Sequence, residues 1–261
     1  MTSLDTSALA HELLAIAEGI AQKAGELLVV RPDVFDINQK SSARDFATQM
    51  DHASEAFIVQ SILALRPHDG IIGEEGGNTS GTSGITWIID PIDGTVNYFY
   101  GHPGWNVSIA AKDSSGVLIG VVYSPTINSL WHGIRGEGAF LNGLPIHVTD
   151  CTSLIDALVG TGFSYDVNQR REQAVFVANL IPKVRDIRRV GAAAVDLCMV
   201  ASGALDGYFE ASLKEWDLAA GGLIAQEAGA IVTGRHGGTP DDEMVIAAGP
   251  ALHEILMREI G

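Results

Sequence analysis

The feature that most constrains this chain is a short stretch in which a β-branched apolar run ends in two carboxylates. Residues 85–95 read ITWIIDPIDGT. An apolar run of this kind predicts a buried strand that carries Asp90 to its end. Pro91 keeps Asp90 extended and stiffens the bend, because the residue before proline is pushed out of the helical region and proline fixes its own φ. The stretch therefore predicts a rigid strand end that presents Asp90 and Asp93 together.

Two acids this close on a stiff turn repel each other unless a cation lies between them. A hard divalent ion such as Mg²⁺ binds through one or two carboxylates and keeps positions open for phosphate and water. Gly94 lets backbone amides approach an anion, and Thr95 adds a hydroxyl. The stretch therefore predicts a site for a metal ion and a phosphate group.

The charge balance narrows the class of partner. The chain of 261 residues has a formal net charge of −16, which argues against a nucleic-acid partner because affinity for nucleic-acid phosphates rests on Lys and Arg. No apolar run approaches the roughly 20 residues of a membrane span, and no basic segment precedes the first apolar residues. Cys151 and Cys198 lie in unrelated segments. We therefore expect a cytoplasmic protein without a signal peptide or a membrane partner.

The first half of the chain predicts two helices and a set of strands. Helical spacing of apolar residues predicts a helix over residues 9–27, with Thr6 or Ser7 as its N-cap. Residues 40–50 are polar and irregular, and Asp51 is expected to cap the second helix. A mostly antiparallel sheet should lie behind these helices, with a hairpin turn at Asn142-Gly143. The strand-like runs cover residues 70–73, 85–89, 105–112, 117–123 and 130–134.

From residue 157 onward, strand-like and helical segments alternate, which predicts an α/β layer. We expect one compact unit over residues 1–261, with a division near Asp150 into residues 1–150 and 151–261. The strand-like runs cover residues 157–160, 187–190, 208–209, 230–233 and 245–248, and the helical ones cover 169–184, 192–201, 217–228 and 251–260. The fold class is therefore α/β, with mixed α and β layers.

The presence of Asp90 and Asp93 changes the interpretation of two further acidic residues, Glu74 and Asp217. Glu74 follows a short apolar strand and stands among glycines, a context typical of a solvated turn. Asp217 stands near the start of a predicted helix, where a capping aspartate is the commonest explanation. Because two carboxylates already point to a metal site, Glu74 and Asp217 become candidate ligands as well.

Together these motifs resemble the inositol monophosphatase family of Mg²⁺-dependent, lithium-sensitive phosphatases, essentially from end to end. The residues that carry the resemblance are Gly73-Glu74-Glu75, Asp90-Pro91-Ile92-Asp93-Gly94-Thr95, Trp216-Asp217-Leu218-Ala219-Ala220-Gly221 and Glu227-Ala228-Gly229. The resemblance implies a layered αβαβα sugar-phosphatase-like fold and a homodimer. It also implies roughly two or three Mg²⁺ per subunit.

The resemblance also implies roles for individual residues. Thr95 and Asp45 correspond to the pair that orients and activates the attacking water, and Glu74 is counted with them as catalytic. The implied metal ligands are the side chains of Glu74, Asp90, Asp93 and Asp217 and the carbonyl of Ile92. The implied substrate contacts are Asp93, Gly94, Thr95, Gly191, Ala192, Ala193, Glu210 and Asp217. A hydroxylated residue is common in the family where this chain has Ala192.

The expected activity is Mg²⁺-dependent hydrolysis of inositol monophosphate by a metal-activated water, with Glu210 reading the ring hydroxyls. Fructose 1,6-bisphosphate, histidinol phosphate, adenosine 3′,5′-bisphosphate and NADP remain alternative substrates within the family. A phosphatase of the haloacid dehalogenase type is disfavoured, because two residues rather than one separate Asp90 from Asp93. A non-enzymatic Mg²⁺-binding interaction protein is a further alternative, although all four acidic ligands are present.

Overall fold

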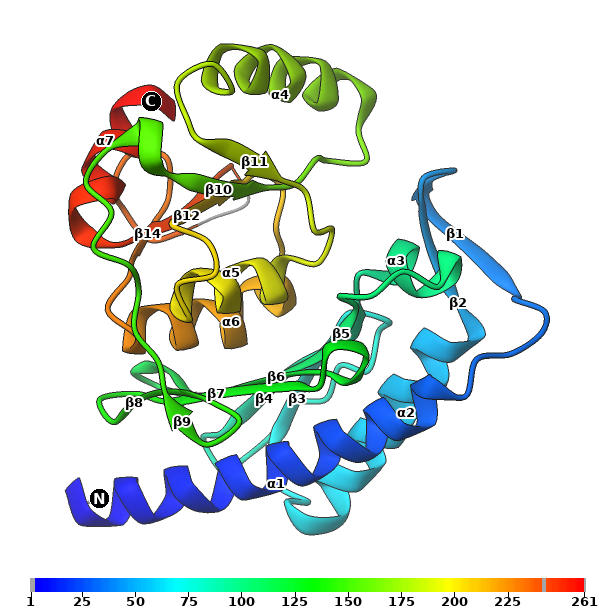
Figure 1. The fold of residues 1–261 in the computed structure, drawn as a ribbon. Helices are drawn as coiled ribbons and strands as arrows, with labels where there is room; N and C mark the ends of the chain where they lie inside the picture. Colours follow the sequence, from blue (N-terminus) through cyan, green and yellow to red (C-terminus); the bar gives the residue numbers. More distant parts are fainter. Residues whose placement is uncertain (1–2, 241–242, 261) are drawn as a thin grey trace.

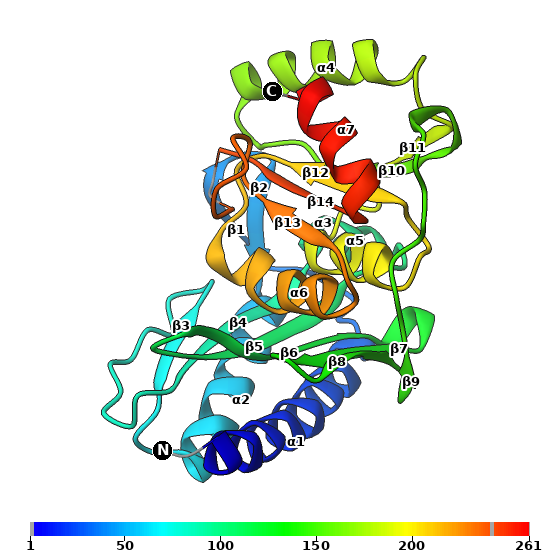
Figure 2. The same cartoon turned by 90° about the vertical axis from the view of Figure 1, so that its left-hand side faces the viewer.

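The structure is a computed structural model that describes residues 3–240 and 243–260. Figure 1 shows alternating layers of helices and sheets, which confirms the predicted α/β class and the αβαβα arrangement. The view in Figure 2 places one helix pair below the larger sheet, one pair between the sheets and one pair above the smaller sheet. These pairs are α1 (Ser3–Val29) with α2 (Gln49–Leu65), α5 (Ala193–Ala201) with α6 (Glu215–Glu227), and α4 (Val167–Leu180) with α7 (Pro250–Ile260).

The larger sheet has seven strands in the order β3-β4-β5-β6-β7-β8-β9 and is antiparallel except where β3 pairs with β4. Asn142 and Gly143 have φ values of 49° and 77° between the last two strands, which confirms the predicted hairpin turn. The strands are β3 (Gly70–Gly73), β4 (Thr86–Asp93), β5 (Asn106–Asp113), β6 (Gly116–Ser124), β7 (Ser129–Ile134), β8 (Gly138–Leu141) and β9 (Leu144–Pro145).

The smaller sheet has five strands in the order β11-β10-β12-β14-β13. Strand β10 is parallel to both of its neighbours, and β14 is antiparallel to both of its own. Asp150 lies in the segment that joins the last strand of the larger sheet to the first strand of the smaller one. The strands are β10 (Leu158–Thr161), β11 (Asp186–Arg188), β12 (Gly207–Glu210), β13 (Ile231–Thr233) and β14 (Val245–Ala248).

Strand β4 is buried almost throughout because helices cover both faces of its sheet. Trp87 and Ile89 pack into the apolar cluster between the larger sheet and helices α1 and α2. Ile88 packs into the cluster around α5 and α6. The site-bearing end of β4 is therefore anchored on both faces. None of the described helices combines the length and apolar character needed to cross a membrane.

Three local expectations are wrong. Helix α1 begins at Ser3, so Thr6 and Ser7 lie inside it. The stretch expected to be irregular forms most of an antiparallel hairpin of β1 (Ile37–Ser42) and β2 (Asp45–Thr48). The N-cap of α2 is Thr48, and Asp51 completes the capping box from within the first turn.

Helix α6 lies so close to the larger sheet that a substitution at their contact should change the stability of the protein. A Cβ on Gly120 of β6 would lie 2.8 Å from the carbonyl oxygen of Ala220 in α6, and a backbone atom cannot swing away. We expect Gly120→Ala to destabilise the protein by about 1–3 kcal/mol, as overpacking does. The measurement is the free energy of unfolding in urea.

The same substitution at Gly19 is the matched control. Gly19 lies within α1, and nothing lies within 4 Å of the Cβ it would gain. Gly19→Ala should stabilise the protein by about 0.5–1 kcal/mol, because glycine in a helix loses more backbone entropy on folding than alanine does. Equal effects of the two substitutions would contradict the close packing at Gly120.

Candidate active site

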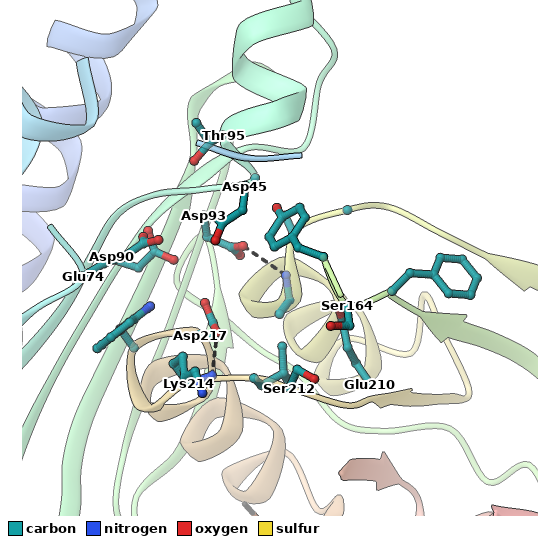
Figure 3. A pocket seen from close by; sticks show the side chains of 18 of the residues that line it. Asp45, Glu74, Asp90, Asp93, Thr95, Ser164, Glu210, Ser212, Lys214 and Asp217 are labelled. Atoms are coloured by element: carbon teal, nitrogen blue, oxygen red, sulfur yellow. Dashed lines mark hydrogen bonds between the residues drawn. The ribbon is translucent and has the colours of Figure 1, made fainter. Parts of the chain in front are cut away.

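A cavity of about 520 Å³ opens where the end of β4 meets the starts of α5 and α6. Figure 3 shows acidic side chains from both halves of the chain directed toward it. Every predicted site residue lines this cavity: Asp45, Glu74, Asp90, Ile92, Asp93, Gly94, Thr95, Gly191, Ala192, Ala193, Glu210 and Asp217. The structure therefore brings together motifs that lie more than a hundred residues apart in the sequence.

Asp90 is the acid most enclosed by other acids. Its side chain is nearly inaccessible, with 2% of the residue exposed, and its Oδ1 accepts a hydrogen bond from the Ile92 N–H at 3.0 Å. Burial, followed by the charges of Glu74, Asp93 and Asp217, raises the pKa of Asp90 well above its ordinary value. A cation would relieve this crowding.

Asp93 joins the two halves of the chain. Its Oδ1 accepts from the Ala193 N–H at 3.1 Å, and its Oδ2 accepts from the Ala194 N–H at 2.8 Å and from the Asn106 amide at 2.8 Å. The Asp93 carboxylate thus lies at the N-terminus of α5, where helix amides favour negative charge. Burial nevertheless outweighs these hydrogen bonds and raises the pKa of Asp93 to about 6.

Glu74 receives a cation from the β1–β2 hairpin. Lys40 Nζ lies 2.7 Å from Glu74 Oε1 and 2.5 Å from Glu75 Oε1. Burial opposes the charge of Lys40, but the two glutamates outweigh it and raise the pKa of Lys40. The loop itself is held from α2, where Glu55 accepts from the amides of Glu75 and Gly77, each at 2.8 Å. Glu74 is therefore fixed by contacts from two sides.

Asp217 lies in the first turn of α6. Its Oδ2 accepts from the Lys214 N–H at 2.6 Å, so the helix-capping role is present. Burial, followed by the charge of Asp93, raises the pKa of Asp217 well above its ordinary value. The capping explanation and the metal-ligand explanation are thus compatible, since the second carboxylate oxygen remains available.

The donor set fits a hard divalent cation. In the described parts of the chain, no three acidic, histidine or cysteine side chains converge closely enough to hold a metal ion as they stand, and protein donors contact Glu74, Asp93 and Asp217. All the candidate donors are nevertheless carboxylate or carbonyl oxygens around one acid-rich cavity, which is the ligand chemistry of Mg²⁺.

The hydroxyl of Thr95 has a different partner from the one expected. Thr95 Oγ1 donates to Asp51 Oδ1 at 3.0 Å and lies 3.1 Å from the Ile92 carbonyl. The carboxylate of Asp45 instead accepts from the amide and hydroxyl of Ser41. The predicted pairing of Thr95 with Asp45 is therefore wrong in this structure, although Asp45 lines the cavity.

Asp51 is suited to hold a proton. It is completely buried, and its Oδ2 accepts from both the amide and the hydroxyl of Thr48. Burial raises the pKa of Asp51, and the hydrogen bonds from Thr48 and Thr95 reduce that rise. One carboxylate thus caps α2 with one oxygen and supports Thr95 with the other.

Glu210 lies on the other side of the cavity. The Tyr208 hydroxyl donates to Glu210 Oε2 at 2.5 Å, and burial raises the pKa of Glu210 to about 7. A Cβ on Gly162 would collide with this carboxylate, so the glycine makes room for it. The cavity also contains polar residues that the motifs did not reveal: Lys40, Ser164, Tyr165, Gln169, Arg189, Ser212 and Lys214.

Comparisons with known proteins find relatives over nearly the whole chain. The family model described as the inositol monophosphatase family matches residues 9–261. The chain is 40% identical to the inositol-1-monophosphatase SuhB of Mycobacterium tuberculosis, over 94% of this chain and 92% of that protein. It is also 40% identical to the Nus factor SuhB of Escherichia coli, over 87% of each chain. The extragenic suppressor protein SuhB of Bartonella henselae superposes with a TM-score of 0.91 at 32% identity, over 95% of this chain and 98% of that one.

Proposed function

Because the chain belongs to the inositol monophosphatase family, we propose that it hydrolyses inositol monophosphate to inositol and phosphate with Mg²⁺ as cofactor. The observation that carries the proposal is the acid-rich cavity, where Glu74, Asp90, Asp93 and Asp217 surround a strand end beside Thr95. The family membership also decides against the haloacid dehalogenase alternative with its aspartyl nucleophile.

These four acids and the Ile92 carbonyl would hold the metal ions. Mg²⁺, when bound, supplies charge neutralisation for the phosphate and makes water more acidic. The chain needs no nucleophile of its own, because phosphoryl transfer depends mainly on positioning and charge stabilisation. In our proposal Thr95 orients the attacking water and Asp51 takes up its proton through the Thr95 hydroxyl.

The phosphate should bind at the start of α3 (Thr95–Tyr100). Gly94 precedes this helix with φ 88°, and a Cβ there would lie 3.2 Å from the Gly191 carbonyl and from Ala192. The glycine therefore lets the segment from residue 191 to 193 approach the phosphate turn. That segment and Glu210 would then face the inositol ring.

The test is phosphate release from myo-inositol 1-phosphate with Mg²⁺ and with EDTA. We expect release that requires Mg²⁺ and exceeds release from fructose 1,6-bisphosphate, histidinol phosphate, adenosine 3′,5′-bisphosphate and NADP. Preference for one of these other esters would overturn the proposed substrate but keep the metal site. Release that EDTA leaves unchanged would overturn the metal-dependent mechanism.

A second candidate function follows from the names of relatives. The Escherichia coli and Pasteurella multocida proteins, each 40% identical to this chain, are named Nus factor SuhB. If this chain had only an interaction role, no ester would release phosphate. The homodimer and the lithium sensitivity common in the family are further proposals, to be checked by sedimentation and by inhibition with Li⁺.

A further inference from the structure

The start of α4 supplies a wall of the cavity that the predicted site residues do not include. Gln169, in the first turn of α4, lines the cavity together with Ser164, Ser212 and Glu210. Figure 3 shows the last three across the cavity from Asp90. This wall therefore faces whatever part of a substrate extends away from the acidic cluster.

We propose that Gln169 is a specificity-determining residue whose amide nitrogen donates a hydrogen bond to a hydroxyl of the substrate's alcohol portion, beside Glu210. The inference rests on the proposed function, because it assigns a contact to the leaving group of the same phosphate ester. On this wall of the cavity, the Gln169 amide would be the hydrogen-bond donor and Glu210 would be the acceptor.

Two serine hydroxyls hydrogen-bond the oxygen of the Gln169 amide. Ser164 Oγ donates to Gln169 Oε1 at 2.6 Å, and Ser212 Oγ donates to the same oxygen at 2.9 Å. Ser164 Oγ itself accepts from the Asp166 N–H at 3.1 Å, which leaves its proton for Gln169. The amide oxygen therefore faces the serines, and among the described residues the amide nitrogen has no hydrogen-bond partner.

The backbone of Ser212 supports this assignment. Ser212 has φ 73°, in the left-handed region that residues other than glycine rarely occupy. Strain of this kind persists only where the surroundings hold it, and it gathers at functional sites. In this backbone conformation, the side chain of Ser212 reaches Gln169. The unusual backbone conformation and the hydrogen bond to Gln169 thus occur at the same residue of the cavity wall.

The chemistry of the wall matches a hydroxyl group. Glu210 Oε2 accepts from Tyr208, which leaves Oε1 as an acceptor for the ligand. A hydroxyl carries one donor and two acceptor positions, so the hydroxyls of a polyol can donate to Glu210 and accept from Gln169. A phosphorylated polyol gains both hydrogen bonds, whereas phosphate alone gains neither.

The test is Gln169→Leu in the full-length protein. The KM for myo-inositol 1-phosphate should rise about 3- to 10-fold, as for the loss of one neutral hydrogen bond, with kcat unchanged. The inhibition constant of inorganic phosphate, which has no hydroxylated ring, should stay the same. Ser212→Gly should raise the same KM while raising the Tm, because glycine relieves the strain. A purely structural role for Ser212 would not move stability and substrate binding in opposite directions.

Gln22→Leu is the matched control. Gln22 is an exposed residue of α1 and does not line the cavity. An equal rise in KM for Gln22→Leu, or an unchanged KM for Gln169→Leu in an active enzyme, would overturn the inference alone. Absence of ester hydrolysis by the unaltered protein would instead remove the proposed function, and this inference with it.

Discussion

Asp90→Asn is expected to remove nearly all Mg²⁺-dependent phosphatase activity while leaving the protein folded. The amide oxygen of the introduced asparagine would still accept the Ile92 N–H that holds the turn, so the strand end should keep its shape. The substitution removes the negative charge at the most enclosed of the four acids. If several kcal/mol of transition-state stabilisation depend on the metal, kcat falls by roughly 10³-fold. Steady-state release of phosphate measures this.

A second measurement separates loss of the metal from loss of the fold. Without Mg²⁺, Asp90→Asn should have an equal or higher Tm, because burial and the neighbouring acids disfavour the charge that it removes. The rise in Tm that Mg²⁺ gives the unaltered protein should vanish. The control is Asp113→Asn, since Asp113 pairs with Arg135 away from the cavity and its loss should leave turnover unchanged. Near-normal turnover by Asp90→Asn would refute the metal site.

Three of the four cavity acids could be predicted from the sequence because each carries a strong local signal. Asp90 and Asp93 end a continuous apolar run, and Glu74 ends another. Such runs predict buried strands, and because β3 and β4 pair in parallel, their carboxyl ends meet at the same edge of the sheet. Asp217 needed a second line of reasoning, because a helix start alone indicates only a cap. The structure shows that Asp217 serves as the cap and lines the cavity as well.

The β1–β2 hairpin was not readable for the opposite reason. Five of the six residues of β1 are exposed, and they show no alternation of apolar and polar side chains. Pattern-based prediction detects the side of a strand that becomes buried, and a strand without such a side gives no signal. Lys40, which the hairpin brings to Glu74, was missed as a consequence. The ion pairs of Lys40 with Glu74 and Glu75 depend on tertiary structure alone.

The partner of Thr95 was misassigned because one side chain has two roles. Asp51 was interpreted as a helix cap, and the capping box with Thr48 is indeed present. That role uses only one carboxylate oxygen, and the other is free to reach Thr95. Asp45 lies six residues earlier in the same polar stretch, and only the packing of α2 against β4 distinguishes the two aspartates.

Asp51→Asn and Asp45→Asn make the distinction measurable, because the same change is applied to both candidates. In Asp51→Asn the amide oxygen can still accept from Thr48, so the cap of α2 is retained. The amide nitrogen then faces Thr95 and offers a donor where the hydroxyl needs an acceptor. Removal of a proton acceptor from the reaction should lower kcat about 10²-fold, with KM nearly unchanged.

Asp45→Asn should lower kcat by less than about threefold, since Asp45 contacts Ser41 and not Thr95, and the asparagine oxygen can still accept both hydrogen bonds from Ser41. The Tm of both variants should stay close to that of the unaltered protein, because neither change creates a cavity. A large fall in kcat for Asp45→Asn with normal turnover by Asp51→Asn would restore the pairing expected from the sequence. The opposite result would show that Thr95 works through a carboxylate that the first turn of α2 holds in place, so that helix capping and proton transfer depend on one side chain.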